Sequence, residues 1–504
     1  MTTSAATPSI LLALLRRHPG SSPAVIVPEQ NLTVSYGALI DQVEGLARSL
    51  AGAGVRPGDR VGIALPNGLP TIVSFLAASV AGTAAPLNPG YREDEFRFYL
   101  EDTSARVMLL PPDGAEEARK AAGTTVRTMA VAMDKDAVRL VDGNGQGPLA
   151  QPSTNDTALI LHTSGSTGRP KRVPLTHANI LVSAGNVAAT YNLTADDVSL
   201  CVMPLFHVHG LVASVLATFA TGGTVVVPAK FNPLSFWRVA HEHRATWYSA
   251  VPTLHQLLLA RVTPGAARPT GSERLRFIRS CSASLAPQTM QDLEAAFGAP
   301  VLEAYGMTEA AHQMASNPLP PSARKPGSVG QGTGVRISIM DDKGQHLPTG
   351  ERGEVVIQGP NVIRGYENNP EANATSFTDG WFRTGDQGVL DASGYLSLTG
   401  RLKELINRGG EKISPREIDE VLLAHPKIAE AVCFGAPHPT WGEEVAAAVV
   451  AREPVTDAEL QAYCKERLAE FKRPKQIFIT DTIPRTATGK IQRRLVAQAF
   501  SAKS

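Results

Sequence analysis

The amino-acid sequence predicts an α/β protein in which residues 1–400 form two parallel α/β subdomains and a small β-barrel-like subdomain, and residues 401–504 a small α+β domain. Three observations support this class. The chain has 504 residues, too many for a single hydrophobic core. From its start, short apolar runs typical of buried strands alternate with helical segments, the pattern of parallel sheets covered by helices. Residues 326–400 are instead rich in glycine and β-forming residues, and a charged passage follows them.

The first subdomain is predicted from alternating strand and helix signals. Strands are expected at residues 24–27, 61–65 and 107–110. A helix is expected from Tyr36 to about Ala53, where two glycines can end it, and a buried helix from Thr71. Residues 111–156 are polar, and we expect an irregular surface segment there.

A glycine-rich loop follows the next apolar run. Residues 159–171 read Leu-Ile-Leu-His-Thr-Ser-Gly-Ser-Thr-Gly-Arg-Pro-Lys. Backbone N–H groups in such a loop can approach an anion closely, and the hydroxyl groups and Lys171 add donors and charge. A nucleotide polyphosphate is the natural ligand, and a flexible surface turn is the alternative. The spacing matches neither the Walker loop nor the dinucleotide fingerprint.

Two later stretches also combine apolar strands with polar chemistry. His207 and His209 lie in an apolar region, but no third metal ligand has suitable spacing, so hydrogen-bonded histidines are favoured over a metal site. In residues 301–309 an apolar strand leads to Tyr305 and Glu309. A ring can stack on a base, and a carboxylate can hold Mg²⁺ against phosphate oxygens. Taken alone, the segment is equally consistent with an ordinary strand end.

The remaining elements lie in the last 180 residues. Residues 326–400 contain short β-rich runs with glycine turns every 8–12 residues, which predicts a small antiparallel barrel or sheet. Asp386 follows such a turn, where it could bind the paired hydroxyls of a sugar or simply be exposed. Two capping boxes, at residues 414–417 and 456–459, predict helices in the C-terminal domain. Lys490 lies on a loop after Thr-Gly, where a solvated lysine is the default.

Composition argues against several classes of protein. The net charge is +1, which gives no electrostatic basis for binding nucleic acid or an anionic membrane. No clean run of about 20 apolar residues is present, so no membrane span is expected. Four widely spaced cysteines predict free thiols in a reducing compartment, and without a recognisable targeting segment we expect a cytoplasmic location. The sequence leaves the oligomeric state open.

Taken together, these stretches resemble the adenylate-forming superfamily of acyl-CoA synthetases, nonribosomal adenylation domains and firefly-type luciferases. The resemblance covers about residues 34–494 and rests on segments 163–171, 305–309, 384–386, 400–403 and 489–490 in this order. It implies two half-reactions on small-molecule substrates. A carboxylate attacks the α-phosphate of ATP with Mg²⁺, giving an acyl-adenylate and pyrophosphate. The thiol of coenzyme A then displaces AMP.

The resemblance also implies a role for each matching residue. Lys490 bridges the acid and the α-phosphate, Thr308 contacts the α-phosphate and Glu309 holds Mg²⁺. The implied ATP- and AMP-binding residues are Thr163, Ser164, Gly165, Ser166, Thr167, Gly168, Lys171, Ala304, Tyr305, Thr308, Asp386 and Arg401. The C-terminal domain is implied to be mobile, with its hinge near Lys403. Its rotation would bring Gly409, Gly410 and Glu411 to the coenzyme A channel.

Four segments resemble oxalate–CoA ligases of plants and fungi more narrowly, namely residues 203–211, 279–287, 303–312 and 405–415. Oxalate is small and carries two charges, so its pocket should be short and polar rather than an apolar tunnel. The expected acid-binding residues are His207, His209, Ser280, Ser282, Ser284 and His312. The alternatives are a ligase for malonate or a medium-chain fatty acid, a stand-alone adenylation enzyme that loads a carrier protein, and a non-catalytic binding protein.

Overall fold

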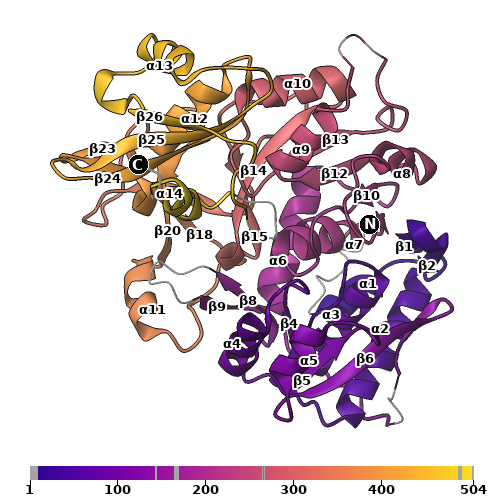
Figure 1. The fold of residues 1–504 in the computed structure, drawn as a ribbon. Coiled ribbons are helices and arrows are strands. Elements are labelled where there is room, and N and C mark those ends of the chain that lie inside the picture. The colour runs from indigo at the N-terminus through magenta and orange to yellow at the C-terminus, as the bar shows by residue number, and fades with distance from the viewer. Residues whose placement is uncertain are drawn as a thin grey trace.

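The computed structural model describes residues 10–141, 145–163, 170–263, 265, 267–485 and 491–501, and these residues form four β-sheets of nine, seven, five and five strands (Figure 1). The predicted α/β class is confirmed. The two large sheets are mainly parallel and covered by helices, and a smaller mixed sheet forms near the C-terminus.

The seven-stranded sheet lies in the part of Figure 1 drawn in indigo and purple. Its strands, in spatial order, are β7 (Ala137–Leu140), β6 (Arg127–Asp134), β5 (Val107–Leu110), β3 (Arg60–Ile63), β4 (Thr83–Pro86), β8 (Thr157–Thr163) and β9 (Lys171–Thr176). Its helices are α1 (Leu11–Leu15), α2 (Tyr36–Gly52), α3 (Leu69–Ala81), α4 (Glu93–Thr103) and α5 (Glu116–Ala122). Alternate residues of β5 enter two different hydrophobic clusters, one with α2 and α3 and one with α4 and α5. Burial on both faces explains why β5 is apolar throughout.

The expectation of an irregular segment at residues 111–156 is wrong. Helix α5 and strands β6 and β7 lie within it. β6 and β7 pair antiparallel, and β7 is the edge strand of the sheet. The apolar middle of β6, Met129–Met133, consists mostly of alanine and methionine, which favour helices over strands, and β7 has only four residues, so both strand signals are weak.

The nine-stranded sheet carries the candidate site residues Ser280, Ala304, Tyr305 and His312. Its spatial order is β16 (Gln331–Gly332), β15 (His312–Ser316), β14 (Val301–Met307), β13 (Phe277–Ser280), β12 (Trp247–Ala250), β10 (Val198–Leu200), β11 (Thr224–Val226), β1 (Pro23–Val27) and β2 (Leu32–Ser35). The surrounding helices are α6 (His177–Thr190), α7 (Ala217–Phe219), α8 (Phe236–Glu242), α9 (Pro252–Leu259) and α10 (Pro287–Phe297), with a π-helix at His209–Leu216 and short 3₁₀ turns at Pro28–Gln30 and Thr308–Ala310.

A five-stranded antiparallel sheet matches the barrel-like subdomain expected from the glycine-rich segment. It consists of β17 (Arg336–Met340), β18 (Arg352–Gln358), β20 (Trp381–Leu390), β19 (Phe377–Thr378) and β21 (Leu396–Arg401), and α11 (Pro370–Ser376) precedes β19. Strand β20 bends at Gly385, where φ is 73° and an L side chain would be strained. This bend precedes Asp386 and sets its position.

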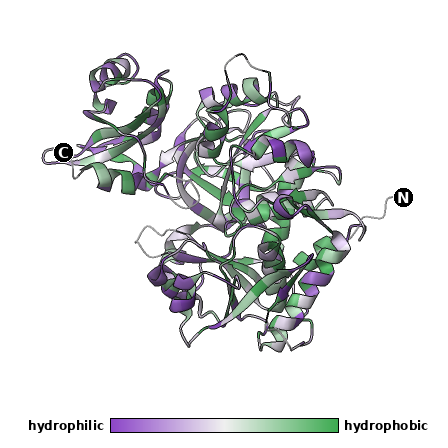
Figure 2. Ribbon diagram, turned by 45° about the vertical axis from the view of Figure 1, so that its right-hand side comes forward, coloured by the Kyte–Doolittle hydropathy of each residue, from purple (hydrophilic) through white to green (hydrophobic). Residues whose placement is uncertain are grey.

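The C-terminal sheet forms the lobe that stands apart in Figure 2. Its strands are β23 (Glu411–Ile413), β22 (Ile406–Arg408), β25 (Gly442–Ala451), β24 (Ile428–His438) and β26 (Gln476–Ile479). Its helices are α12 (Pro415–Leu423), α13 (Asp457–Lys465) and α14 (Arg493–Ser501), with 3₁₀ turns at Leu402–Glu404 and Glu470–Lys472. Successive residues of β24 face α12 and α13 on one side and α14 on the other.

The two predicted capping boxes differ in outcome. Thr456 caps α13 by accepting a hydrogen bond from the Glu459 N–H at 3.2 Å. Ser414 precedes α12 but makes no cap, because its hydroxyl donates to the carbonyl of Thr399 instead. Ser414 therefore ties the start of the C-terminal lobe to β21, and the sequence pattern alone does not reveal this choice.

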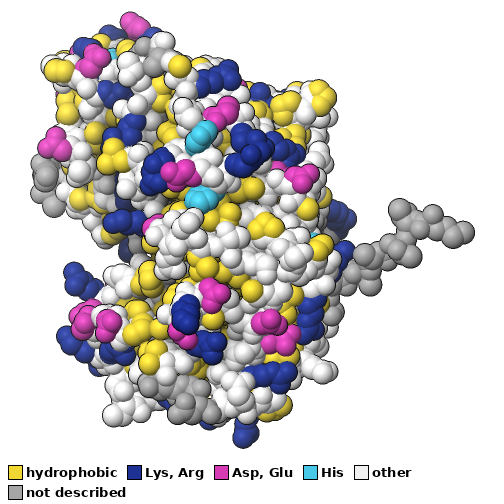
Figure 3. All heavy atoms as spheres, turned by 90° about the vertical axis from the view of Figure 1, so that its right-hand side faces the viewer, with side chains coloured by type: hydrophobic (Ala, Val, Ile, Leu, Met, Phe, Trp, Pro, Cys, Tyr) yellow, Lys and Arg dark blue, Asp and Glu magenta, His cyan; other side chains and the backbone are white. Residues whose placement is uncertain are grey.

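Three further features of the structure bear on the classes of protein that composition argues for or against. All four cysteines are buried and unpaired. Among the described residues no helix is long and apolar enough to cross a membrane. On the face drawn in Figure 3, lysine and arginine are interspersed with acidic residues, in keeping with the net charge of +1.

Candidate functional site

One hairpin brings the candidate residues together. Strand β14, the 3₁₀ turn and β15 carry Tyr305, Thr308, Glu309 and His312, all of them buried. The turn is tight, since Ala311 and His312 have φ of 51° and 118°. Gly306 faces this turn, and a Cβ there would overlap the backbone carbonyl of His312. The hairpin thus needs glycine at this position to hold its polar residues on a fixed backbone.

The first group, the Asp386 corner, consists of Tyr305, Asp386 and Arg401. Asp386 is 5% exposed and accepts a hydrogen bond from the Tyr305 hydroxyl at 2.5 Å. Arg401 lies opposite Asp386 in the β20–β21 pairing, and its Nε is 2.9 Å from Asp386 Oδ1. Burial, reinforced by the Asp386 charge, raises the pKa of Tyr305 far above its usual range, so this hydroxyl stays a donor. Ala304, also expected among the ATP- and AMP-binding residues, precedes Tyr305 in β14 and is buried.

The second group, the Glu309 corner, consists of Thr163, Lys171, Glu309 and Tyr366. Glu309 Oε1 accepts hydrogen bonds from Thr163 at 3.1 Å and from Tyr366 at 2.9 Å. Lys171 lies at the start of β9, with its Nζ 4.4 Å above the Tyr366 ring. Burial lowers the pKa of Lys171, which the Glu309 charge partly offsets and the Lys403 charge reinforces. The two ends of the glycine-rich loop therefore meet the hairpin at Glu309.

The donor set of the Glu309 corner fits Mg²⁺ held jointly with a nucleotide. Both hydroxyls donate to Oε1, and Oε2 accepts no hydrogen bond from the described residues. No group of three or more metal-binding side chains occurs in the described part of the chain. Mg²⁺ is usually held by one or two carboxylates together with substrate phosphates rather than by an all-protein cage. A single buried glutamate beside the two described ends of the glycine-rich loop, Thr163 and Lys171, matches that pattern.

The third group, the His–Arg cluster, consists of His209, Ser249, Arg279, Ser282 and His312. His209 Nδ1 is 3.0 Å from the Ser282 hydroxyl, and its Nε2 is 2.6 Å from the Ser249 hydroxyl. The His209 and His312 rings lie 5.1 Å apart, centre to centre. Arg279 contacts both rings, with nitrogen–nitrogen distances of 3.4 and 3.3 Å. Burial and then the Arg279 charge hold the pKa of both histidines well below its usual range, so both are neutral near pH 7.

The other residues expected to bind the acid, His207, Ser284 and Ser280, are buried to different degrees. His207 is partly buried, and its Nδ1 accepts a hydrogen bond from the His209 N–H at 3.2 Å. Ser284 is exposed on the loop after β13. Ser280 is fully buried, and its hydroxyl has no hydrogen-bond partner among the described residues. Because neighbouring strand residues face opposite sides and Arg279 faces the histidines, Ser280 points away from the cluster.

Arg279, Ser249 and Tyr366 were not expected from the sequence. Arg279 carried a usable signal, since a charged residue inside the apolar strand Phe277-Ile-Arg-Ser is costly to bury and usually has a specific purpose. Ser249 and Tyr366 carried none, because a serine in a strand and a tyrosine in a loop are ordinary.

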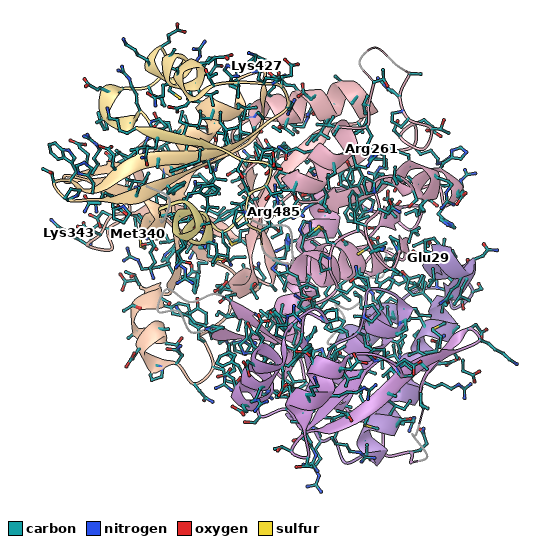
Figure 4. All side chains as sticks on the ribbon, viewed as in Figure 1. Glu29, Arg261, Met340, Lys343, Lys427 and Arg485 are labelled. Atoms are coloured by element: carbon teal, nitrogen blue, oxygen red, sulfur yellow. The ribbon has the colours of Figure 1, made fainter. Side chains whose placement is uncertain are left out.

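The expected C-terminal site residues are exposed. Lys403 lies in the 3₁₀ turn between β21 and β22. Gly409 and Gly410 form the turn of the β22–β23 hairpin with positive φ, and Glu411 follows them. Lys490 and residues 164–168 of the glycine-rich loop lie outside the described residues. Arg485 is described and pairs with Glu430 of β24, on the side of the C-terminal sheet toward the main body in the view of Figure 4.

Comparison with known proteins gives consistent similarities. A family model described as AMP-binding enzyme matches residues 13–367, and one described as AMP-binding enzyme C-terminal domain matches residues 417–490. An oxalate–CoA ligase of Arabidopsis thaliana is 49% identical over 94% of both chains. One of Saccharomyces cerevisiae is 46% identical over 95% of both chains. The crystal structure of ATP-bound MatB from Rhodopseudomonas palustris, 30% identical and covering 97% of this chain and 98% of its own, superposes with a TM-score of 0.90, whereas the apo form gives 0.78 with the same coverage.

Proposed function

We propose that this chain, which belongs to the AMP-binding enzyme family, converts oxalate into oxalyl-CoA at the expense of ATP. Its family membership and its similarity to CoA ligases identify it as an AMP-forming acyl-CoA ligase that uses ATP, Mg²⁺ and coenzyme A. The choice of oxalate rests on the His–Arg cluster. Its two neutral histidines and a serine offer hydrogen-bond donors to a small acid, and a long acyl chain would leave these buried polar groups unpaired.

The described residues would act mainly by binding and orienting the two reacting anions. The Asp386 carboxylate would accept hydrogen bonds from the ribose hydroxyls, and Thr163 and Lys171 would contact the polyphosphate. One oxygen of the acid forms a bond to the α-phosphorus while the bond to the β-phosphate oxygen breaks, so pyrophosphate leaves. Mg²⁺, bound through Glu309, would neutralise phosphate charge. Lys490 would bridge acid and α-phosphate, and Thr308 would contact the α-phosphate.

We also propose a boundary at residues 400–401, with a hinge near Lys403, about which residues 401–504 rotate between the half-reactions. The connection supports this, because Leu402–Glu404 is a short exposed 3₁₀ turn between two sheets. The contacts across it include the Ser414 bond to Thr399 and one from Gln256 to Ala429 at 3.5 Å. The higher TM-score with ATP-bound MatB supports an orientation suited to the first half-reaction. Gly409, Gly410 and Glu411 would reach the coenzyme A channel after rotation.

The location of the reaction is proposed to be the cytoplasm. The support is chemical, since all four cysteines are free thiols and burial raises the pKa of Cys201 and Cys464 to about 12 and 11. Thiols in this state are typical of reducing compartments.

Coenzyme A-dependent AMP release with different acids tests the substrate. Oxalate, malonate and octanoate are compared at saturating ATP, Mg²⁺ and coenzyme A, and kcat/KM is expected to be highest for oxalate. Faster turnover of malonate or octanoate would contradict the choice of acid while leaving the ligase chemistry intact. AMP release that needs no coenzyme A but requires a carrier protein would favour the adenylation-enzyme alternative.

A further inference from the structure

Arg279 is a fully buried arginine whose contacts are all neutral. Its exposed fraction is 0%. Its guanidinium donates to the Tyr191 hydroxyl at 2.9 Å, to the Ser249 hydroxyl at 2.9 Å and to Gln313 Oε1 at 3.0 Å, and it contacts the two histidines. No carboxylate among the described residues forms an ion pair or hydrogen bond with it. Glu303, the carboxyl nearest in strand pairing, lies opposite Ser280 in β13–β14, and so on the other face of the sheet.

A buried charge of this kind is unusual in energetic terms. Neutral dipoles replace part of the lost hydration of the guanidinium, but they do not cancel its charge, and desolvation of an unpaired ion is costly. The neighbouring arginine shows the ordinary solution, because Arg276 forms an ion pair in which its Nη1 donates to both oxygens of Asp197 at 2.7 Å. The absence of such a partner at Arg279, within the described part of the chain, indicates that a ligand supplies the negative charge.

The guanidinium also fixes the direction of the hydrogen bonds around it, since it can only donate. Ser249 accepts from Arg279, so its own hydrogen is directed to His209 Nε2. The neutral His209 ring then carries its hydrogen on Nδ1 and donates to Ser282. The Ser282 hydrogen is left for a ligand, and Ser282 is only partly buried, at the start of the loop after β13.

The same rule applies to His312. Its Nδ1 faces an Arg279 nitrogen at 3.3 Å and must accept, so the neutral ring carries its hydrogen on Nε2. That Nε2 makes no hydrogen bond to the described residues. Arg279 thus makes the Ser282 hydroxyl and the His312 Nε2–H donors toward a ligand. Its positive charge lies on the side of these two groups that faces away from that ligand.

We propose that Arg279 is the positioning residue that makes the site selective for acids with a second negative charge. Its charge balances the distal carboxylate of the acid through the Ser249–His209–Ser282 relay and through His312, without touching the acid itself. This inference deepens the proposed function and rests on it, because it assigns the His–Arg cluster to the acid.

Oxamate, the monoamide of oxalate, provides the test. It has the size and shape of oxalate, but its distal group is neutral. Pyrophosphate release at saturating ATP and Mg²⁺ gives kcat/KM for both acids with the full-length protein. The wild type is expected to prefer oxalate on the order of 100-fold. Arg279→Met should lower that ratio at least tenfold, through loss of oxalate activity, whereas Arg279→Lys should keep it within about threefold because the charge is retained.

Arg276→Met is the matched control. It makes the same substitution three residues earlier and leaves Asp197 without its partner, so it should lower the melting temperature but leave the oxalate-to-oxamate ratio unchanged within twofold. Equal loss of activity toward both acids in Arg279→Met, with an unchanged ratio, would overturn the proposal. If Arg279→Met does not fold, Ser249→Ala breaks the relay at small cost in volume. An unchanged ratio in that variant also overturns the role.

Failure of the oxalate assignment is distinguishable from failure of this inference. If the wild type does not activate oxalate, the same comparison is made with malonate and its monoamide. A preference for malonate that Arg279→Met abolishes supports the role of Arg279 and rejects oxalate as the acid. A wild type that does not distinguish either diacid from its monoamide rejects the role of Arg279.

Discussion

At the scale of single residues, the site is organised by groups that can hydrogen-bond in one direction only. The Tyr305 hydroxyl stays protonated and donates to Asp386, and two hydroxyls donate to one oxygen of Glu309. Glu309 therefore has one oxygen committed to the protein and another with capacity for a ligand, whereas both oxygens of Asp386 already contact the protein, one through Tyr305 and one through Arg401. Substitutions that keep shape but change charge are the sharpest tests of such an arrangement.

Glu309→Gln is expected to lower the rate of pyrophosphate release on the order of 100-fold, because an amide cannot replace a carboxylate as a ligand for Mg²⁺. Titration with Mg²⁺ should show a raised requirement for the metal. Glu371→Gln, an exposed change at the start of α11, serves as control. A normal Mg²⁺ dependence in Glu309→Gln would remove this residue from the metal site.

Buried histidines make stability depend on pH. Burial lowers the pKa of His255 to about 4, against 6.5 in the unfolded chain. The unfolded state binds the proton first, so the free energy of unfolding falls as pH drops below 6.5, by about 2 kcal/mol from this residue at pH 5. Burial raises the pKa of Glu303 to about 7, which acts in the opposite direction.

His255→Phe isolates this contribution, since the Glu303 effect is common to both proteins. Urea unfolding at pH 7 and pH 5 should show a pH-dependent loss that is about 2 kcal/mol smaller in the variant. The substitution keeps a ring of similar size and removes one weak contact, 3.3 Å between His255 Nδ1 and the Tyr248 hydroxyl. Identical pH dependence in the two proteins would mean that His255 is protonated as readily in the folded state as in the unfolded chain.

At the scale of elements, the β14–β15 hairpin is the frame of the site. It supplies Tyr305 to the Asp386 corner, Glu309 to its own corner and His312 to the His–Arg cluster. Three groups of the candidate site therefore depend on one turn, and a small shift in its backbone would disturb all of them together.

Gly306→Ala is expected to destabilise the fold by about 1–3 kcal/mol, because the added methyl overlaps the His312 carbonyl and neither strand can move freely. Loss of both ATP and acid affinity should accompany it. Gly185→Ala in α6 has open space around its Cβ and should instead stabilise by about 0.5–1 kcal/mol. Urea unfolding and ligand-induced shifts in melting temperature measure both effects.

How much of the fold follows from sequence depends on burial. β5 matches its expected bounds because it is buried on both faces, whereas β6, rich in alanine and methionine, and the four-residue edge strand β7 give only weak strand signals. The residues of the Asp386 and Glu309 corners, except Tyr366, lie in the motifs that carry the family resemblance, and their types suit ATP chemistry. Arg279 and Ser249 come from neighbouring strands, and only pairing of Trp247 with Phe277 and Ser249 with Arg279 reveals that they meet.

At the scale of the whole molecule, the C-terminal lobe contacts the rest of the described chain through hydrogen bonds such as those of Ser414 and Gln256. The lobe has its own core on both faces of β24, and Leu402–Glu404 connects it to β21. Separate cores joined by a short turn permit rigid-body rotation, and a network of ion pairs such as Arg493–Asp419 keeps the lobe itself intact.

Lys490→Ala is expected to abolish adenylate formation by a factor of about 10² or more while sparing thioester formation from supplied acyl-adenylate. The two half-reactions are measured separately, as pyrophosphate release and as coenzyme A consumption. The exposed Lys343→Ala change, in the turn before β18, is the control. Equal loss of both half-reactions would contradict a rotation that removes Lys490 from the second.

The burial of all four cysteines has a practical consequence. Thiol-reactive fluorophores need an accessible thiolate, and Cys201, Cys281, Cys433 and Cys464 are inside hydrophobic packing or fully shielded strands. The native chain should therefore give almost no background labelling. One cysteine introduced on the body and one on the lobe would carry a donor–acceptor pair of dyes without removal of any native cysteine. Energy transfer between the dyes could then follow the lobe through a catalytic cycle in real time.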